Sequence, residues 1–300
     1  MKRFILNSLV CLCVFVLIWG IAEYAKEEIY FPNAYSYKYK YVRGNPSIKT
    51  LLIGHSHFEN SINPYLMGDS IYDFAISGRR WIYWDMKLAE QLIPTMQNLR
   101  NVIFPLGYVM PYESPHFQPL SDVIKDNIYQ YGKNMHVSYD RFPENYWYKS
   151  ALVYNDMKIH FGREMDQDRL GYYKLEGQCD EWETDQNVDS NVYMGEVAQQ
   201  CYSEFKEYFI QLAKVCNDNN IRFIAVTCPC ADCYVQNTRP QGIKNLYDLV
   251  DSVRVYYPVE YYNYLDDADF RADSLYYNCS HLNSIGADKF AIRLKNDLGL

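Results

Sequence analysis

The chain has 300 residues, of which 49% are hydrophobic and 17% aromatic, and its formal net charge is -8. This length and apolar content suffice to bury one large core, which excludes a disordered chain. The acidic pI near 5.3, together with the absence of basic runs interleaved with aromatics, excludes a phosphate-tracking surface, so we expect no nucleic-acid partner.

The N-terminal segment, residues 1–29, predicts a membrane anchor. Two basic residues, Lys2 and Arg3, precede an uncharged apolar stretch from Phe4 to Ala22 that is long enough to span a bilayer. A cleaved signal peptide has a shorter apolar core and a small-residue cleavage site, so we favour a retained helix over a signal peptide. The positive-inside rule then places the rest of the chain outside the cytoplasm, on the periplasmic side.

The remainder predicts a linker at 30–47, polar and rich in tyrosine, followed by one domain over 48–300. Short apolar runs predict strands, and helical spacing predicts helices between them. The expected strands are 49–56, 70–78, 101–109, 221–229 and 259–267, and the expected helices are 80–98, 197–217 and 284–298. This alternation predicts an α/β three-layer sandwich around a central parallel sheet of about five strands. The irregular stretch at about 111–195 is expected to be an insertion that covers a site.

The turn after the first strand carries the sequence Gly54, His55, Ser56. Ligands of open parallel sheets bind at the carboxyl ends of the strands, where this turn lies. A serine on a strand-to-helix turn has an exposed hydroxyl, and the N–H groups beside it can stabilise an oxyanion. His281, in the loop before the last helix, can reach across the same edge and act as the base.

These two segments together resemble the SGNH/GDSL hydrolase superfamily, in particular its membrane-anchored members that modify cell-envelope polysaccharides with acyl groups. The turn matches the family's Gly-Asp-Ser block, and Gly78 in FAISG matches the glycine of its second block. The run from Asn278 to His281 matches Asp-x-x-His, and the following LNSIGADKF and the earlier SINP are similar to the anchored members. The similarity covers residue 49 to the end, apart from the insertion.

The resemblance implies a flavodoxin-like fold, no cofactor, and a serine esterase or O-acyltransferase. Ser56 would attack an ester carbonyl, His281 would take its proton and Asn278 would orient the histidine. The N–H groups of Ser56 and Gly78 would form the oxyanion hole. The acyl group would pass to water or to a sugar hydroxyl, and the implied partners are a cell-envelope glycan or acylated carbohydrate and a membrane acyltransferase.

Three departures from the family pattern bear on activity. His55 and Asn278 each stand where the family has aspartate, and FPLGYVMPY lacks a clear Gly-x-Asn third block. Candidate substitutes for the missing third-block asparagine are Asn134, Asn145 and Asn155, and the nearest candidate carboxylate within the loop that carries the histidine is Asp273. The alternative is therefore a catalytically degenerate SGNH-fold protein that binds glycan or docks on a membrane acyltransferase.

A metal site is the second alternative, because His55 and His57 form an H-x-H pair like the one that begins the amidohydrolase barrels. The other candidate ligands, His116, His136 and His160, fall inside the irregular insertion, which disfavours that interpretation. We therefore expect no metal, and His57 is expected to be a surface or capping residue.

The nine cysteines divide into Cys11 and Cys13 in the apolar segment and seven beyond it, an odd number that leaves at least one unpaired within the chain. The cluster CPCADC at 228–233 lacks the paired C-x-x-C spacing of a zinc ribbon. The cluster favours a disulfide or cysteines packed in the core, and the spacing does not indicate which cysteines pair.

Overall fold

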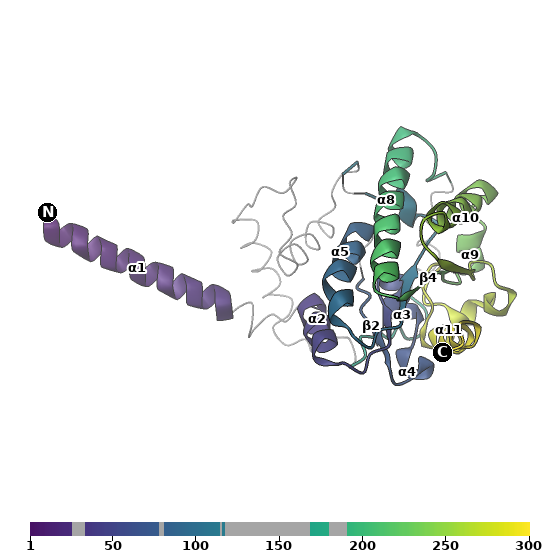
Figure 1. Cartoon of the computed structure of the whole chain (residues 1–300), viewed down its shortest axis with the longest axis horizontal. Helices are drawn as coiled ribbons and strands as arrows, with labels where there is room; N and C mark the ends of the chain where they lie inside the picture. Colours follow the sequence, from purple (N-terminus) through teal and green to yellow (C-terminus); the bar gives the residue numbers. More distant parts are fainter. Residues whose placement is uncertain (26–33, 78–80, 115, 118–168, 180–190) are drawn as a thin grey trace.

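The computed structural model describes residues 1–25, 34–77, 81–114, 116–117, 169–179 and 191–300. The first element, α1 (Lys2–Ala25), is an apolar helix whose side chains are exposed as far as Ile21, and it is drawn apart from the domain in Figure 1. Among the described residues, this one helix is long and apolar enough, over Lys2–Ile21, to cross a membrane. Its length and composition suit a membrane span and equally a signal sequence.

A five-stranded parallel sheet in the order β2-β1-β3-β4-β5 forms the centre of the domain. This result confirms the predicted α/β class and the flavodoxin-like strand order. The strands lie within the predicted stretches but are shorter, because each apolar run continues into the loop at the carboxyl edge. Their bounds are β1 Thr50–Leu52, β2 Ile71–Asp73, β3 Asn101–Pro105, β4 Arg222–Thr227 and β5 Glu260–Asn263.

Alternate residues of each strand point to opposite faces of the sheet. Because both sets are apolar, helices cover both faces. Leu51 and Phe104 belong to one buried core, and Leu52 and Ile103 belong to the other. The first core is covered by α2 (Ala34–Gly44), α5 (Ile82–Leu92), α8 (Glu196–Asp218) and α10 (Pro240–Arg254). The second is covered by α3 (Ser56–Ser61), α4 (Pro64–Met67) and α11 (Ser284–Leu298). The predicted three-layer sandwich is therefore confirmed, and Figure 1 shows α5 beside α8.

Short helices complete the loops. They are α9 (Asp232–Val235) and the 3-10 turns η2 (Ile93–Thr95), η3 (Met110–Tyr112), η4 (Ala268–Phe270) and η5 (Asp273–Leu275). The predicted helix over 80–98 ends as α5 at Leu92, because Pro94 follows in η2 and cannot continue the α-helical hydrogen bonds.

Helix α2 differs from the prediction of a linker at 30–47. Tyr35, Lys38 and Val42 recur at helical spacing and are all buried against the domain. The Tyr35 ring lies edge-on to Phe74, with 5.5 Å between ring centroids. The tyrosines and lysine of this segment look polar in the sequence, yet their apolar parts pack on the core. Residues 34–44 therefore belong to the folded domain.

The predicted insertion at 111–195 falls mostly outside the described residues. One part of it, residues 169–179, is called the strap here because it runs across several elements. The Leu170 carbonyl accepts from Asp73 N at 2.9 Å, next to β2, and Tyr173 N donates to Glu59 O of α3 at 2.9 Å. Gly171, at φ +87°, approaches so closely that an added Cβ would lie 1.9 Å from Asp73 O. The strap is therefore packed directly on the edge of the sheet.

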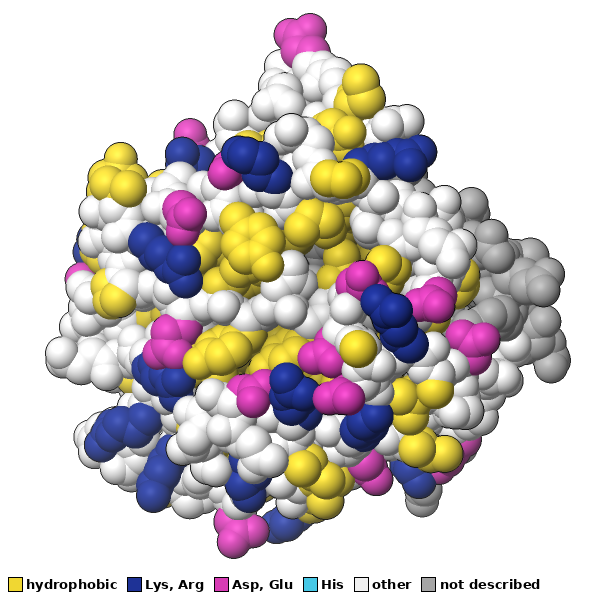
Figure 2. All heavy atoms as spheres, turned by 90° about the vertical axis from the view of Figure 1, so that its right-hand side faces the viewer, with side chains coloured by type: hydrophobic (Ala, Val, Ile, Leu, Met, Phe, Trp, Pro, Cys, Tyr) yellow, Lys and Arg dark blue, Asp and Glu magenta, His cyan; other side chains and the backbone are white. Residues whose placement is uncertain are grey.

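The face on the right of Figure 1 carries β5, α9, α10 and α11. Figure 2 shows this face, where basic and acidic side chains alternate around a central group of hydrophobic ones. Lys244 pairs with Asp248 within α10, and Arg293 of α11 pairs with Asp269 of η4. Solvent-exposed pairs of this kind contribute little to stability, so the mixed charge serves mainly solubility.

Candidate active site

The nucleophile turn is shaped by Gly54, which has φ +128°. A Cβ at this position would lie 2.3 Å from the Pro105 ring at the end of β3, so only glycine allows the two strand ends to approach. Ser56 follows as the first residue of α3, as predicted for a strand-to-helix turn. His55 is the N-cap, and its Nδ1 accepts from His57 N at 3.5 Å. Histidine here does the capping that an aspartate side chain also performs.

Ser56 and His281 meet at the carboxyl edge of the sheet. The Ser56 Oγ lies 2.8 Å from His281 Nε2, which is hydrogen-bond distance. Both side chains are half-buried, so they remain accessible from outside. The two predicted residues are thus brought together in the arrangement of a nucleophile and its base.

The loop before α11 orients His281. The Asn278 Oδ1 accepts from the backbone N–H groups of Ser280 at 3.1 Å and His281 at 2.8 Å, which closes a tight turn. The same oxygen lies 3.1 Å from His281 Nδ1, so the asparagine reaches the ring as predicted but is shared with the turn.

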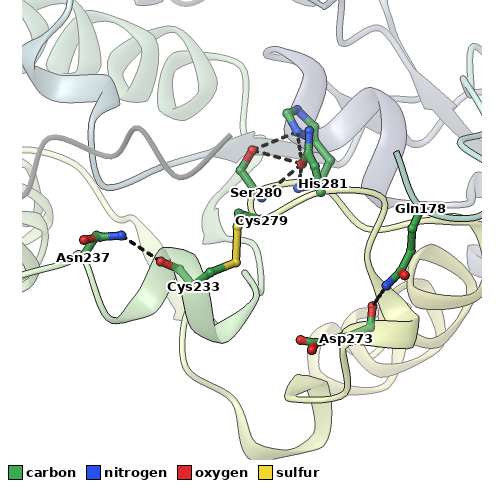
Figure 3. The surroundings of a disulfide bond; sticks show 8 residues. Gln178, Cys233, Asn237, Asp273, Cys279, Ser280 and His281 are labelled. Atoms are coloured by element: carbon green, nitrogen blue, oxygen red, sulfur yellow. Dashed lines mark hydrogen bonds between the residues drawn. A yellow bond between two sulfur atoms is a disulfide. The ribbon is translucent and has the colours of Figure 1, made fainter. Parts of the chain in front are cut away.

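Ser280 is a site residue that the sequence analysis did not single out. Its Oγ lies 2.9 Å from His281 Nδ1, and Figure 3 shows these two side chains next to each other. The same Oγ donates to Asn278 Oδ1 at 3.4 Å. The sequence feature that could have indicated this contact is the serine directly before the histidine. That signal is weak, because the contact depends on how the turn folds back. The ring therefore has two oxygen partners at Nδ1.

A disulfide joins Cys233 of α9 to Cys279, which lies inside the histidine loop (Figure 3). The Cα atoms are 5.9 Å apart, and Ala231 N donates to Cys279 O at 3.1 Å, so the two segments are joined twice. The cysteine cluster is therefore a disulfide site together with buried thiols, as the spacing favoured. Burial raises the pKa of the Cys228 thiol well above its usual value, which keeps this cysteine protonated and unreactive.

His57 is not the surface or capping residue that the sequence indicated. Its ring stacks on His281 with centroids 4.8 Å apart and planes at 16°, and its Nδ1 lies 3.2 Å from His55 Nδ1. Within the described ranges, no group of three His, Cys, Asp or Glu side chains is placed to hold a metal ion. The histidine pair instead packs against the base.

A small hollow at the carboxyl edge of the sheet has His55 and His57 in its lining. The ends of β3 and β4 line it together with Tyr234 and Leu265. Ser56 and His281 do not line it, so the hollow adjoins the histidine pair and does not define the substrate-binding space.

Five predicted residues remain, of which four lie outside the described part of the chain and one is described elsewhere in the domain. Gly78, Asn134, Asn145 and Asn155 lie outside the described residues, so the proposed oxyanion and third-block positions stay predictions. Asp273 is described, on η5. Its backbone oxygen accepts from Gln178 at 2.7 Å, and its side chain lies away from His281 in Figure 3. The structure therefore does not bring this carboxylate to the histidine.

No protein-family model matches this sequence, and no curated protein matches it. A solved Bacteroides fragilis protein, provisionally described as an acylhydrolase, is 10% identical with a TM-score of 0.41, over 84% of this chain and 86% of that chain. A Streptococcus pneumoniae protein, provisionally described as a platelet activating factor, is 12% identical with a TM-score of 0.42, over 96% of this chain and 99% of that chain. Such distant likenesses carry no argument about activity, so function is inferred from the site.

Proposed function

We propose that the protein is a serine esterase or O-acyltransferase of the SGNH type that acts on acyl esters of extracytoplasmic polysaccharide. The contact between Ser56 Oγ and His281 Nε2, at 2.8 Å, carries this proposal. Its place at the carboxyl edge of a parallel sheet supports it, because substrates reach such folds at that edge. The oxygens at Nδ1 complete the arrangement of nucleophile, base and orienting group.

The chemistry proceeds in two transfers. Nδ1 of His281 carries a hydrogen toward Asn278 Oδ1 or Ser280 Oγ, which leaves Nε2 free to accept the Ser56 proton. The Ser56 oxygen attacks the ester carbonyl, and the N–H groups of Ser56 and Gly78 stabilise the oxyanion. His281 then protonates the departing alcohol, which leaves the acyl group on Ser56. Water or a sugar hydroxyl removes that group in the second transfer.

Covalent labelling tests this proposal directly. A fluorophosphonate probe followed by peptide mapping should label Ser56, because it reacts with serines activated by a base. Ser56→Ala should abolish both labelling and hydrolysis of p-nitrophenyl acetate, whereas Ser47→Ala, an exposed serine outside the site, should change neither. Equal hydrolysis by the wild type and Ser56→Ala would contradict the serine mechanism.

A glycan-binding protein without catalysis is the second candidate. The observation that favours it is Asn278, which brings no charge to His281 and whose oxygen already accepts two backbone N–H groups. This candidate predicts binding of an acetylated polysaccharide, measured by calorimetry, that Ser56→Ala leaves unchanged and that no Ser56-dependent hydrolysis accompanies. A membrane acyltransferase is the partner that such a protein would serve.

The membrane location is part of the same proposal. Helix α1, with Lys2 and Arg3 at its start, supports an anchor whose domain lies outside the cytoplasm. Protease added to intact spheroplasts should then digest the domain and spare the anchor. Protection of the domain would contradict this topology.

A further inference from the structure

Lys38 is a fully buried lysine whose ammonium group contacts three separate segments. Its side chain is 0% exposed, and it comes from α2, the helix that follows the apolar N-terminal segment in sequence. Nζ donates to Glu59 Oε1 at 3.3 Å, to Gly171 O of the strap at 2.9 Å, and to Ala75 O. An ammonium has three hydrogens, so these acceptors use its full capacity.

The Glu59 carboxylate, 2% exposed, extends this network toward the nucleophile. Its second oxygen, Oε2, accepts from the Ser77 backbone N–H at 2.6 Å and also from the Ser77 hydroxyl. Glu59 lies in the first turn of α3, three positions after Ser56. Ser77 follows β2 and directly precedes Gly78 in the sequence. The carboxylate therefore ties the segment after β2 to the helix that begins with the nucleophile.

We propose that Lys38 is a positioning residue. It holds the Glu59 carboxylate in place, and this carboxylate in turn fixes the position of Ser77 relative to the first turn of α3. The inference rests on the proposed function, because the positioned groups are the nucleophile and the segment leading to the expected oxyanion donor. It assigns this role to one side chain of α2, the Lys38 ammonium, and not to the other buried residues of that helix.

The Lys38–Glu59 ion pair is buried, and a buried ion pair is not explained by a contribution to stability alone. Replacing a buried ion pair by apolar side chains of similar volume is often neutral or stabilising, because desolvation offsets the Coulombic gain. Apolar groups, however, can neither donate hydrogen bonds to Ala75 O and Gly171 O nor accept one from Ser77 N. The charged pair therefore contributes directed hydrogen bonds that fix the positions of the segments it contacts.

Kinetics of Lys38→Met, which keeps the length of the side chain but removes its donors, test the proposal. We expect kcat for p-nitrophenyl acetate to fall by about 10²-fold with little change in KM, since misplacement of about 1 Å can cost that much. The control is Val42→Ala, a buried residue on the same helix. It should lower the melting temperature while leaving kcat unchanged, provided that circular dichroism shows both variants folded at the assay temperature.

Amide hydrogen exchange supplies a readout that does not depend on activity. The peptide containing Ser77 should exchange faster in Lys38→Met than in the wild type, and Val42→Ala should leave it unchanged. If Lys38→Met does not fold, Glu59→Gln, which keeps one oxygen but loses the charge, should show the same loss of kcat and faster exchange.

Wild-type kcat and wild-type exchange in the folded variant would overturn the positioning role while leaving the esterase proposal intact. Absence of Ser56-dependent hydrolysis in the wild type would instead overturn the proposed function. In that case the exchange comparison still decides whether Lys38 holds the Ser77 segment.

Discussion

The Ser56 hydroxyl and the His281 imidazole lie 2.8 Å apart although 225 positions separate them in the sequence. The contact joins the start of α3 to the loop before α11, and α11 packs directly on α3 and α4. Phe290 and Leu294 bury the face of α11 in that core. The last helix therefore carries the histidine to the turn of the first strand.

Asn278→Asp should maintain or raise the Ser56-dependent rate. A carboxylate would keep an acceptor for His281 Nδ1 and add the negative charge that stabilises the imidazolium. Asn278→Leu should lower kcat by about tenfold or more, because losing the orienting partner of a triad histidine can cost up to about 10⁴-fold. Steady-state hydrolysis of p-nitrophenyl acetate measures both variants. Unchanged rates in both would show that Asn278 has no orienting role.

Ser280→Ala should lower kcat by about tenfold, since it removes the oxygen 2.9 Å from His281 Nδ1 and leaves only the shared asparagine. Ser280→Thr retains the hydroxyl and serves as the matched control. The same assay, run with a thermal melt of each variant, separates loss of orientation from loss of fold. If Ser280→Ala were as active as the threonine variant, Asn278 alone would orient the ring.

Loss of the Cys233–Cys279 disulfide should destabilise the domain and lower activity together. The bond closes a loop with a sequence separation of 46, for which a loss of about 3–4 kcal/mol is expected. Cys233→Ser should lower the unfolding midpoint in urea and reduce kcat, because the histidine loop loses its covalent tie to α9. Cys179→Ser, at a free and partly exposed cysteine, is the control. Wild-type activity after complete reduction would show that the tie is dispensable.

Glu260 should contribute to stability in a pH-dependent way. Its Oε2 accepts from Arg222 Nη2 at 2.6 Å, and this hydrogen bond lowers the pKa of the Glu260 carboxyl in the folded state. A lowered folded-state pKa means that the stabilisation is present above the unfolded-state pKa and is lost as pH falls through the folded-state value.

Urea unfolding at pH 7 and pH 3 checks this expectation. Glu260→Gln should cost less than about 1 kcal/mol at pH 7, because the pair is partly exposed to solvent, and should cost less at pH 3. Glu207→Gln, an exposed substitution on α8, should not show that difference. An equal cost of Glu260→Gln at both pH values would contradict the linkage.

The parallel sheet was predictable from local patterns, and Ser56 and His281 were expected to meet because both were placed at the carboxyl edge of that sheet. Apolar runs alternating with helical spacing specify buried strands and crossovers, and Gly54 with Ser56 and His281 mark the ends of two such elements. The placement of these ends at one edge follows from the rules for parallel sheets, whereas the strand order came only from the fold that the resemblance implied.

Tertiary structure alone decided the contacts of Lys38 and Ser280 and the pairing of Cys233 with Cys279. Lys38 lies in a segment whose tyrosines and lysines read as polar, and it is buried only because distant carbonyls and Glu59 supply acceptors for its ammonium. The position of a cysteine in the sequence does not identify its disulfide partner. The Ser280 hydroxyl contacts the His281 ring only because the turn between Asn278 and His281 folds back. Contacts between residues far apart in the chain depend on how whole elements pack, and no local pattern encodes that packing.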